Sequence, residues 1–202
     1  RLAVVQHASN VVGGIQPIAD IADDVRQHGA YFLVDAAQSA GHVPIDLAAL
    51  PIDLLSCSGH KGLLGPLGTG VLVVSDRVVK DLEPLRFGGT GTASEDDRQP
   101  EAPPDKYESG NHNVPGLVGL DVALRWLLEQ GGDMLRGHET ELTARLWVGL
   151  QSIAGVTLFG PDPHQVPRTG VVSLHLAGFS SQDAAAILDD HYDITSRAGL
   201  HC

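Results

Sequence analysis

The chain has 202 residues, of which 43% are hydrophobic and 19% are charged, and its formal net charge is −12. A chain of this length can bury a sizeable core, and the composition is ordinary for a globular protein. The acidic balance and the absence of any run of Lys or Arg argue against nucleic acid or an anionic membrane surface as the main partner.

The first part of the chain alternates between predicted strands and a predicted helix. In "IQPIADIADDVRQHG" the apolar residues recur at helical spacing, and Gly29 stands where a helix C-cap belongs. The segment "AYFLVDA" is almost wholly apolar, which is typical of a strand covered on both faces. The order of strand, helix and strand predicts a mostly parallel α/β sheet. The strands are expected at residues 1–7, 30–36, 52–58 and 70–75, and the helix at residues 15–29.

The second part of the chain predicts a smaller α+β unit. Residues 88–115 are expected to form a loop because prolines and glycines are frequent there. Two domains follow from this reading, a large one over residues 1–130 and a small one over residues 131–202. The expected elements are helices at 116–132, at about 133–153 and at 180–192, and strands in "GVTLFG", in "GVVSLHLAG" and at 193–197.

Polar side chains gather where two of the predicted strands end. Asp35 closes the strand "YFLVD" and Gln38 follows it, while Ser58, His60 and Lys61 follow the next strand. If these strands are parallel, their carboxyl ends meet at one edge of the sheet, where ligands bind in open α/β sheets. A turn-forming or helix-capping role is an equally good interpretation of Asp35 taken alone.

This set of side chains suits a cofactor that carries an aldehyde, a pyridine ring and a phosphate. A lysine forms a Schiff base with the aldehyde, and an aspartate keeps the ring nitrogen protonated so that the ring accepts electrons. Hydroxyl and backbone N–H donors in a glycine-rich turn suit the phosphate. The residues alone do not select pyridoxal phosphate over a P-loop-like phosphate site, although "SGHKG" lacks the P-loop pattern.

The same segments closely resemble the class V aminotransferase superfamily of fold-type I pyridoxal-phosphate enzymes, in particular its cysteine desulfurases and selenocysteine lyases. The resemblance is carried by "HASNVVGG", "FLVDAAQSAGHVPIDL" and "DLLSCSGHKGLLGPLGTGVLVV", and it continues to the end of the chain. It implies a large domain with three layers around a mostly parallel sheet, followed by part of a small α+β domain.

The resemblance also implies roles for individual residues. Lys61 would hold pyridoxal 5'-phosphate as an internal aldimine and would shuttle the substrate α-proton. The other implied contacts are Asp35 with the pyridinium nitrogen, Gln38 with the ring hydroxyl, Ser58 and His60 with the phosphate, and Asn10 with the cofactor or the substrate carboxylate.

Two later segments add to the implied site. "YESGNHN" resembles a family segment whose Gly-Thr pair reaches the phosphate in the other subunit of a dimer, which corresponds here to Gly110 and Asn111. "RAGLHC" resembles the loop of one desulfurase subgroup, so Cys202 would be the nucleophile and Arg197 would bind the substrate carboxylate. A bystander thiol is the alternative for Cys202. Cys57 lies within a predicted strand and is expected to be a small buried apolar residue.

The resemblance implies a cysteine desulfurase that converts L-cysteine to L-alanine and leaves an enzyme-bound persulfide. The expected setting is a homodimer with shared active sites, a sulfur-acceptor protein and iron–sulfur cluster assembly. A selenocysteine lyase or another class V enzyme is one alternative, and a catalytically inactive fragment or interaction module is the second. No nucleic acid and no membrane is expected as a partner.

The remaining features of the sequence predict the cellular compartment, and they give no reason to expect a metal site. Two cysteines make no disulfide framework and no signal peptide is visible, which favours the cytoplasm. The chain starts at Arg1 inside an apolar run and stops without a closing element, so we expect a fragment of a longer protein. The remaining histidines lack metal-ligand spacing and are expected to be ordinary surface or core residues: His7, His28, His42, His138, His164, His175 and His191.

Overall fold

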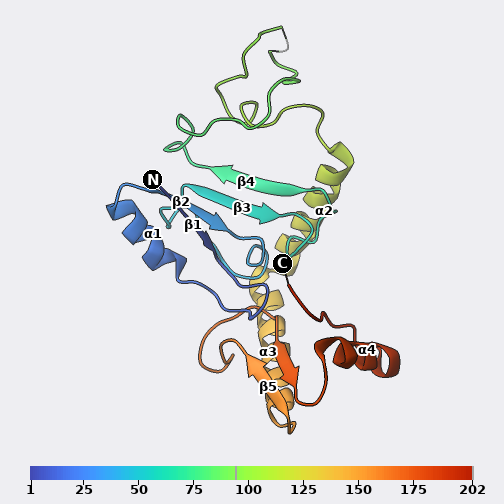
Figure 1. Ribbon diagram of the computed structural model, residues 1–202. Helices are drawn as coiled ribbons and strands as arrows, with labels where there is room; N and C mark the ends of the chain where they lie inside the picture. Colours follow the sequence, from blue (N-terminus) through green and yellow to red (C-terminus); the bar gives the residue numbers. More distant parts are fainter. Residues whose placement is uncertain (94, 202) are drawn as a thin grey trace.

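A four-stranded sheet forms the centre of the first half of the chain in the computed structural model, which describes residues 1–93 and 95–201 (Figure 1). The strand order is β1-β2-β3-β4, in which β1, β2 and β3 are parallel and β4 is antiparallel to β3. The mostly parallel sheet predicted from the sequence is therefore confirmed. The strands are β1 (Leu2–Gln6), β2 (Tyr31–Asp35), β3 (Leu54–Ser58) and β4 (Gly70–Val74).

Helix α1 (Ile18–Gln27) covers one face of this sheet and supplies part of the core. The helix ends one turn before β2, and Gly29 follows its C-cap with a φ of +65°, a left-handed conformation that glycine adopts without strain. Alternate residues of a strand point to the same face, so one face of β2 packs against the helix. The buried core residues are Ile18, Ala22, Phe32, Val34, Ala36, Ile52 and Leu55.

The opposite face of the sheet is more open. Val4 on β1 is 60% exposed and Leu72 on β4 is 49% exposed. Within the described residues, α1 is therefore the helical layer that packs closely on the strands. The second helical layer of the expected three-layer arrangement stays a prediction.

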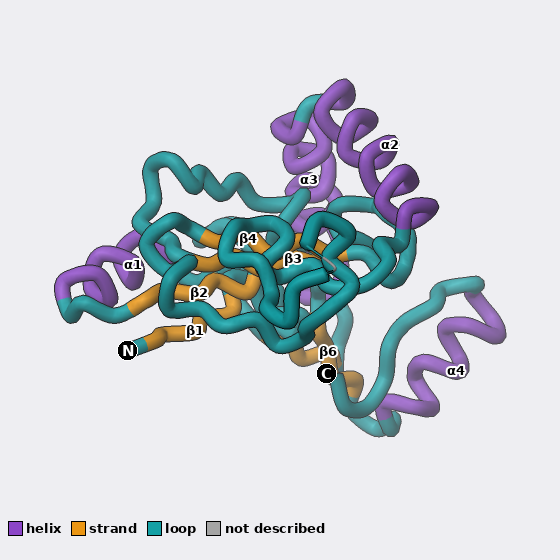
Figure 2. Tube along the Cα trace, turned by 90° about the horizontal axis from the view of Figure 1, so that it is seen from above, coloured by secondary structure: helices purple, strands orange, loops and turns teal. Residues whose placement is uncertain are grey.

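The second half of the chain forms a separate two-stranded sheet with helices beside it. Figures 1 and 2 show α1 at one side of the molecule and α4 at the far side. Gly131, with a φ of +80°, separates the first two helices of this half. None of the helices within the described residues combines the length and apolar character needed to cross a bilayer. The elements are α2 (Val114–Gln130), α3 (Gly132–Gln151), β5 (Val156–Phe159), β6 (Ser173–Leu176) and α4 (Ser181–Tyr192).

One predicted element is wrong, because residues 193–197 do not form a strand. The chain instead turns back onto the end of α4. Asp193 adopts a left-handed conformation with a φ of +53°, and the Ile194 N–H donates to the Leu188 carbonyl oxygen at 3.0 Å. The helix terminus therefore uses the backbone donor that a strand would need for pairing.

Asp53 is a buried carboxylate at the amino end of β3, and it is 2% exposed. Its Oδ2 accepts hydrogen bonds from the Phe32 N–H at 2.9 Å and from Arg77 Nη1 at 2.7 Å. Asp53→Ala removes the acceptor for a buried N–H and for a guanidinium. We expect the free energy of unfolding to fall by about 2–4 kcal/mol, measured by urea denaturation. Exposed Asp76 gives the control Asp76→Ala, and a loss below about 1 kcal/mol for Asp53→Ala would contradict this account.

Candidate active site

The carboxyl ends of β2 and β3 bring two of the predicted site residues to one edge of the sheet. The parallel register pairs Asp35 with Ser56, and Ser58 lies two residues further along β3. Paired residues of adjacent strands, and residues two apart on one strand, share a face. Asp35, Ser56 and Ser58 therefore lie on the same face, opposite the one that α1 covers.

The Asp35 carboxylate has a structural contact and an unused oxygen. The side chain is half-buried, and Oδ1 accepts a hydrogen bond from the Ala37 N–H at 2.9 Å. This bond is the turn-forming role that was the alternative interpretation of Asp35. Within the described residues, Oδ2 receives no hydrogen bond, so the turn contact leaves one oxygen for another donor.

Ser58 and His60 form a hydrogen-bonded pair directly after β3. Ser58 Oγ lies 3.0 Å from His60 Nδ1. When the imidazole is doubly protonated, Nδ1–H donates to the serine oxygen. The hydroxyl proton of Ser58 and the Nε2–H of His60 then remain as donors for an anion. This donor set is chemically suited to a phosphate.

Lys61 lies in a tight turn that follows this pair. The turn is closed by hydrogen bonds from the Leu64 N–H to the Lys61 carbonyl oxygen at 2.8 Å and from the Gly65 N–H to the Gly59 carbonyl oxygen at 2.7 Å. The Lys61 side chain is exposed, and its amine makes no hydrogen bond or ion pair with any residue that the structure describes. An amine without a carboxylate partner is available to a ligand.

Asn10 and Arg197 line one cavity although they are distant in sequence. The cavity has a volume of about 470 Å³ and lies between the loop after β1, strand β6 and the segment after α4. Arg197 was predicted to bind the substrate carboxylate, and Asn10 was predicted to contact the cofactor or the substrate carboxylate. The structure places these two residues on one cavity.

The other predicted contacts lie in different cavities. Gln38 lines a cavity of about 420 Å³ beside α3. Gly110 and Asn111 line a third cavity, of about 280 Å³, beside the start of β4. Asp35 and Lys61 line none of these three cavities. The predicted roles of Gln38, Gly110 and Asn111 stay predictions.

The structure describes one of the two cysteines, Cys57. Cys57 is half-buried and packs against the core, as expected, and burial raises the pKa of its thiol. A raised pKa leaves less of the nucleophilic thiolate at neutral pH. Cys202, the predicted nucleophile, lies outside the described residues.

His7 supports the turn that carries Asp35 and Gln38. Its side chain is buried at the end of β1, and Nδ1 lies 2.8 Å from Ser39 Oγ. Burial lowers the pKa of His7 below its ordinary value of 6.5, because desolvation disfavours the charged form.

The lowered pKa of His7 predicts a pH dependence of stability. As the pH falls through about 6.5, the unfolded chain binds the proton before the folded chain does, so the free energy of unfolding falls. His7→Gln, which keeps an amide near Ser39, is expected to flatten this pH dependence between pH 7 and pH 5 as measured by thermal unfolding. The same substitution at exposed His28 serves as the control, and an unchanged slope in His7→Gln would contradict the assignment.

Sequence reasoning missed the contact between His42 and helix α3. His42 Nδ1 lies 2.9 Å from Glu139 Oε2 across a sequence separation of 97 residues. The sequence holds no local pattern that links the two residues, and only the fold places them together.

A family profile and the sequences of known proteins point to the same family. The profile of the aminotransferase class-V family matches residues 1–202. A probable cysteine desulfurase from Methanothermobacter thermautotrophicus is 38% identical, over 100% of this chain and 50% of the relative.

Solved structures agree with the sequence comparison. The apo structure of a cysteine desulfurase from Thermococcus onnurineus NA1 has a TM-score of 0.86 and 36% identity, covering 94% of this chain and 48% of that chain. The structure of a C-DES variant with glycine covalently linked to its PLP cofactor has a TM-score of 0.83 and 25% identity, covering 94% of this chain and 51% of that chain. The chain spans about half the length of the curated relatives that it matches.

Proposed function

The chain belongs to the aminotransferase class-V family, and we propose on that basis that it carries the catalytic residues of a pyridoxal-phosphate-dependent cysteine desulfurase. The reaction converts L-cysteine to L-alanine and leaves the sulfur on the enzyme as a persulfide. The matches to proteins named cysteine desulfurase, which cover 100% of this chain in sequence and 94% of it in structure, support the proposal.

The observation that carries the proposal is that β2 and β3 place polar residues together at their carboxyl ends. Asp35 and Ser58 share one face at the carboxyl ends of adjacent parallel strands, and Lys61 follows with an amine that has no partner among the described residues. A carboxylate, a hydroxyl and an amine at one edge fit the ring nitrogen, the phosphate and the aldehyde of the cofactor.

The residues present fit pyridoxal phosphate in chemical type. Lys61 holds the cofactor through its amine, Asp35 uses its remaining oxygen to pair with the ring nitrogen, and Ser58 with His60 binds the phosphate. Gln38 hydrogen-bonds the ring hydroxyl. Asn111 of a second subunit supplies an amide donor to the phosphate, next to Gly110. When bound, the cofactor supplies an electron sink for the substrate α-carbon.

The protein's own residues move the proton and the sulfur. Arg197 and Asn10 hold the substrate carboxylate in the cavity that they share. Lys61 takes the α-proton and returns a proton to the carbon skeleton that becomes alanine. The thiolate of Cys202 attacks the substrate sulfur, so that a sulfur–sulfur bond forms as the carbon–sulfur bond breaks and its electron pair goes to the carbon side.

The finer parts of the proposal concern organisation and partners. We assign residues 1–130 to a cofactor-binding domain and residues 131–202 to a small domain, which agrees with the helix break at Gly131. Exposed apolar side chains on α2, namely Val118, Val122 and Leu128, support an interface in a homodimer. A cytoplasmic location, a sulfur-acceptor protein and a role in iron–sulfur cluster assembly complete the proposal.

Product analysis on the whole protein tests this function. We expect pyridoxal phosphate, L-cysteine and the protein to yield alanine and a protein-bound persulfide in equal amounts during a single turnover without an acceptor. Turnover of L-selenocysteine alone would instead identify a selenocysteine lyase, and keto-acid products would identify an aminotransferase. Failure to bind pyridoxal phosphate at all would favour an interaction module.

A further inference from the structure

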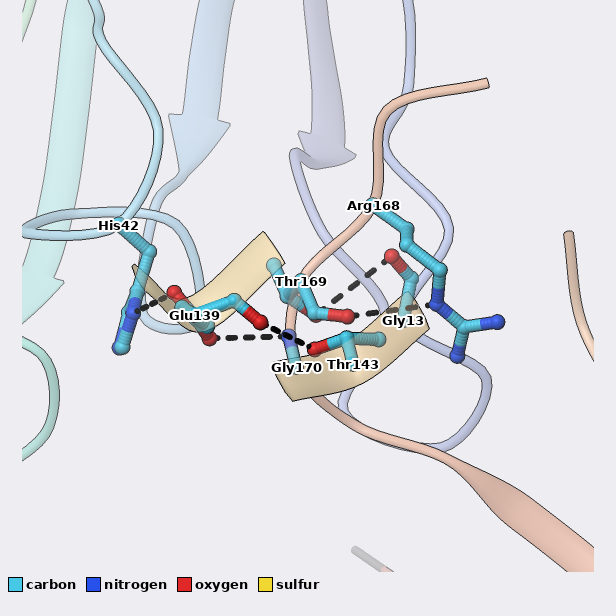
Figure 3. Close-up of polar contacts among 7 residues, drawn as sticks. All are labelled: Gly13, His42, Glu139, Thr143, Arg168, Thr169 and Gly170. Atoms are coloured by element: carbon cyan, nitrogen blue, oxygen red, sulfur yellow. Dashed lines mark hydrogen bonds and ion pairs between the residues drawn. The ribbon is translucent and has the colours of Figure 1, made fainter. Parts of the chain in front are cut away.

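One carboxylate on α3 holds two segments that are distant in sequence. Glu139 Oε2 lies 2.9 Å from His42 Nδ1, and Glu139 Oε1 accepts a hydrogen bond from the Gly170 N–H at 2.9 Å (Figure 3). A carboxylate is an acceptor only, so Nδ1 of His42 carries the proton and donates it to Glu139. The other side of the imidazole ring, with Cδ2 and Nε2, faces a different part of the chain.

This part of the chain is the turn that carries Lys61. A methyl group placed on Gly62 would lie 2.5 Å from His42 Cδ2, 2.7 Å from His42 Nε2 and 2.3 Å from the Ala40 carbonyl oxygen. A methyl group on Gly41 would lie 2.2 Å from the Gly62 carbonyl oxygen. The residue directly after Lys61 therefore packs tightly against the imidazole and the backbone that precedes it, and only glycine fits there.

The second carboxylate oxygen of Glu139 is connected, through Gly170 and Thr169, to the loop that carries Asn10. Gly170 follows Thr169, whose N–H donates to the Gly13 carbonyl oxygen at 3.0 Å. Gly13 belongs to the loop after β1, three residues beyond Asn10. Glu139 thus links the Lys61 turn, through His42, to the Asn10 loop, through Gly170.

We propose that His42, held by Glu139, is a positioning residue that sets the place of Lys61 relative to the cofactor. This inference rests on the proposed function. The imidazole packs against Gly62 and, among the described residues, makes no hydrogen bond with the Lys61 amine, so it acts through the backbone of Gly62. A displacement of a reacting group by about 1 Å can lower the reaction rate on the order of 100-fold.

Binding of two forms of the cofactor distinguishes a positioning role of His42 from a purely structural one. Pyridoxal phosphate bonds to a lysine, whereas pyridoxamine phosphate shares its ring and phosphate contacts but has no aldehyde. For His42→Ala in the whole protein we expect the affinity for pyridoxal phosphate to fall by at least about 10-fold, with the affinity for pyridoxamine phosphate unchanged. Equal losses for both ligands, or no loss for either, would overturn the proposal.

A second pair of variants tests the role of Glu139. Glu139→Ala is expected to reproduce the selective loss. Glu139→Gln is expected to restore most of the affinity for pyridoxal phosphate, because the amide oxygen still accepts from the Gly170 N–H and the amide N–H donates to Nδ1 of the His42 tautomer that carries its proton on Nε2. Glu141, exposed on the same helix, gives the control Glu141→Ala. A Glu139→Gln variant as weak as Glu139→Ala would contradict a positioning role for the hydrogen-bonded pair.

Amide exchange on the cofactor-free protein keeps this inference separate from the proposed function. The amides of Leu64 and Gly65 form the bonds that close the Lys61 turn. His42→Ala is expected to make both amides exchange hydrogen for deuterium faster than in the unmodified protein and in Glu141→Ala. Unchanged exchange would overturn the inference. If the unmodified protein binds neither cofactor form, the proposed function fails, and the exchange rates decide only whether His42 orders the Lys61 turn.

Discussion

Replacement of Lys61 by alanine is expected to abolish the visible absorption of the lysine-bound cofactor and to lower turnover of L-cysteine by at least about 1000-fold. Neither Lys80 nor Lys106 is placed to take over its role. Lys106 is 4% exposed, and its Nζ donates to the Val79 carbonyl oxygen at 2.7 Å. Lys80 precedes Asp81, whose carboxylate accepts a hydrogen bond from the Tyr31 hydroxyl. Tyr31 is the first residue of β2, so Lys80 lies near the amino end of that strand and away from the carboxyl ends that Lys61 follows. Absorption spectra and steady-state kinetics of the whole protein measure both effects.

Lys80→Ala is the matched control for this prediction. It removes an exposed lysine of the same chemistry from the other edge of the sheet, so both the absorption and the turnover are expected to be unchanged. Lys61→Ala with full activity would show that this lysine does not hold the cofactor.

The second large effect is expected for Cys202→Ser. The variant retains the cofactor and binds L-cysteine, because neither step uses the thiol, but it forms no persulfide. Release of alanine from cysteine is expected to fall by at least about 100-fold. A persulfide-selective label followed by mass spectrometry of the whole protein measures the product directly.

Cys57→Ser provides the comparison, since the chain holds two cysteines. Burial raises the pKa of the Cys57 thiol, and the side chain packs against the core, so its replacement is expected to leave the persulfide label in place. A label lost only in Cys57→Ser would mean that the other cysteine is the nucleophile. A label retained in both variants would mean that the protein does not work through a cysteine persulfide.

The sequence was sufficient where a local pattern determines the structure. The helical spacing of Ile18, Ala22 and Val25 predicted α1, and the apolar run before Asp35 predicted the buried strand β2. Parallel strands place their carboxyl ends together, so Asp35 and Ser58 could be assigned to one edge from their positions in the chain alone.

The sequence was insufficient where tertiary contacts decide the outcome. Residues 193–197 were predicted to form a strand, but the Ile194 N–H donates to the Leu188 carbonyl oxygen at the end of α4. Lys106 lies in the segment of residues 88–115 that was predicted to be a loop, yet its side chain is buried and donates to the backbone carbonyl oxygen of Val79. The contact between His42 and Glu139 spans 97 residues and depends on how α3 packs beside the segment that follows β2.

The central claim is that Lys61 carries pyridoxal phosphate, and reductive trapping on the whole protein tests it most directly. The protein is incubated with pyridoxal phosphate, reduced with borohydride, digested and mapped by mass spectrometry, which identifies the modified lysine. We expect the phosphopyridoxyl group on the peptide that contains Lys61 and on neither of the peptides that contain Lys80 and Lys106. A group on another lysine, or no modified peptide at saturating cofactor, would contradict it.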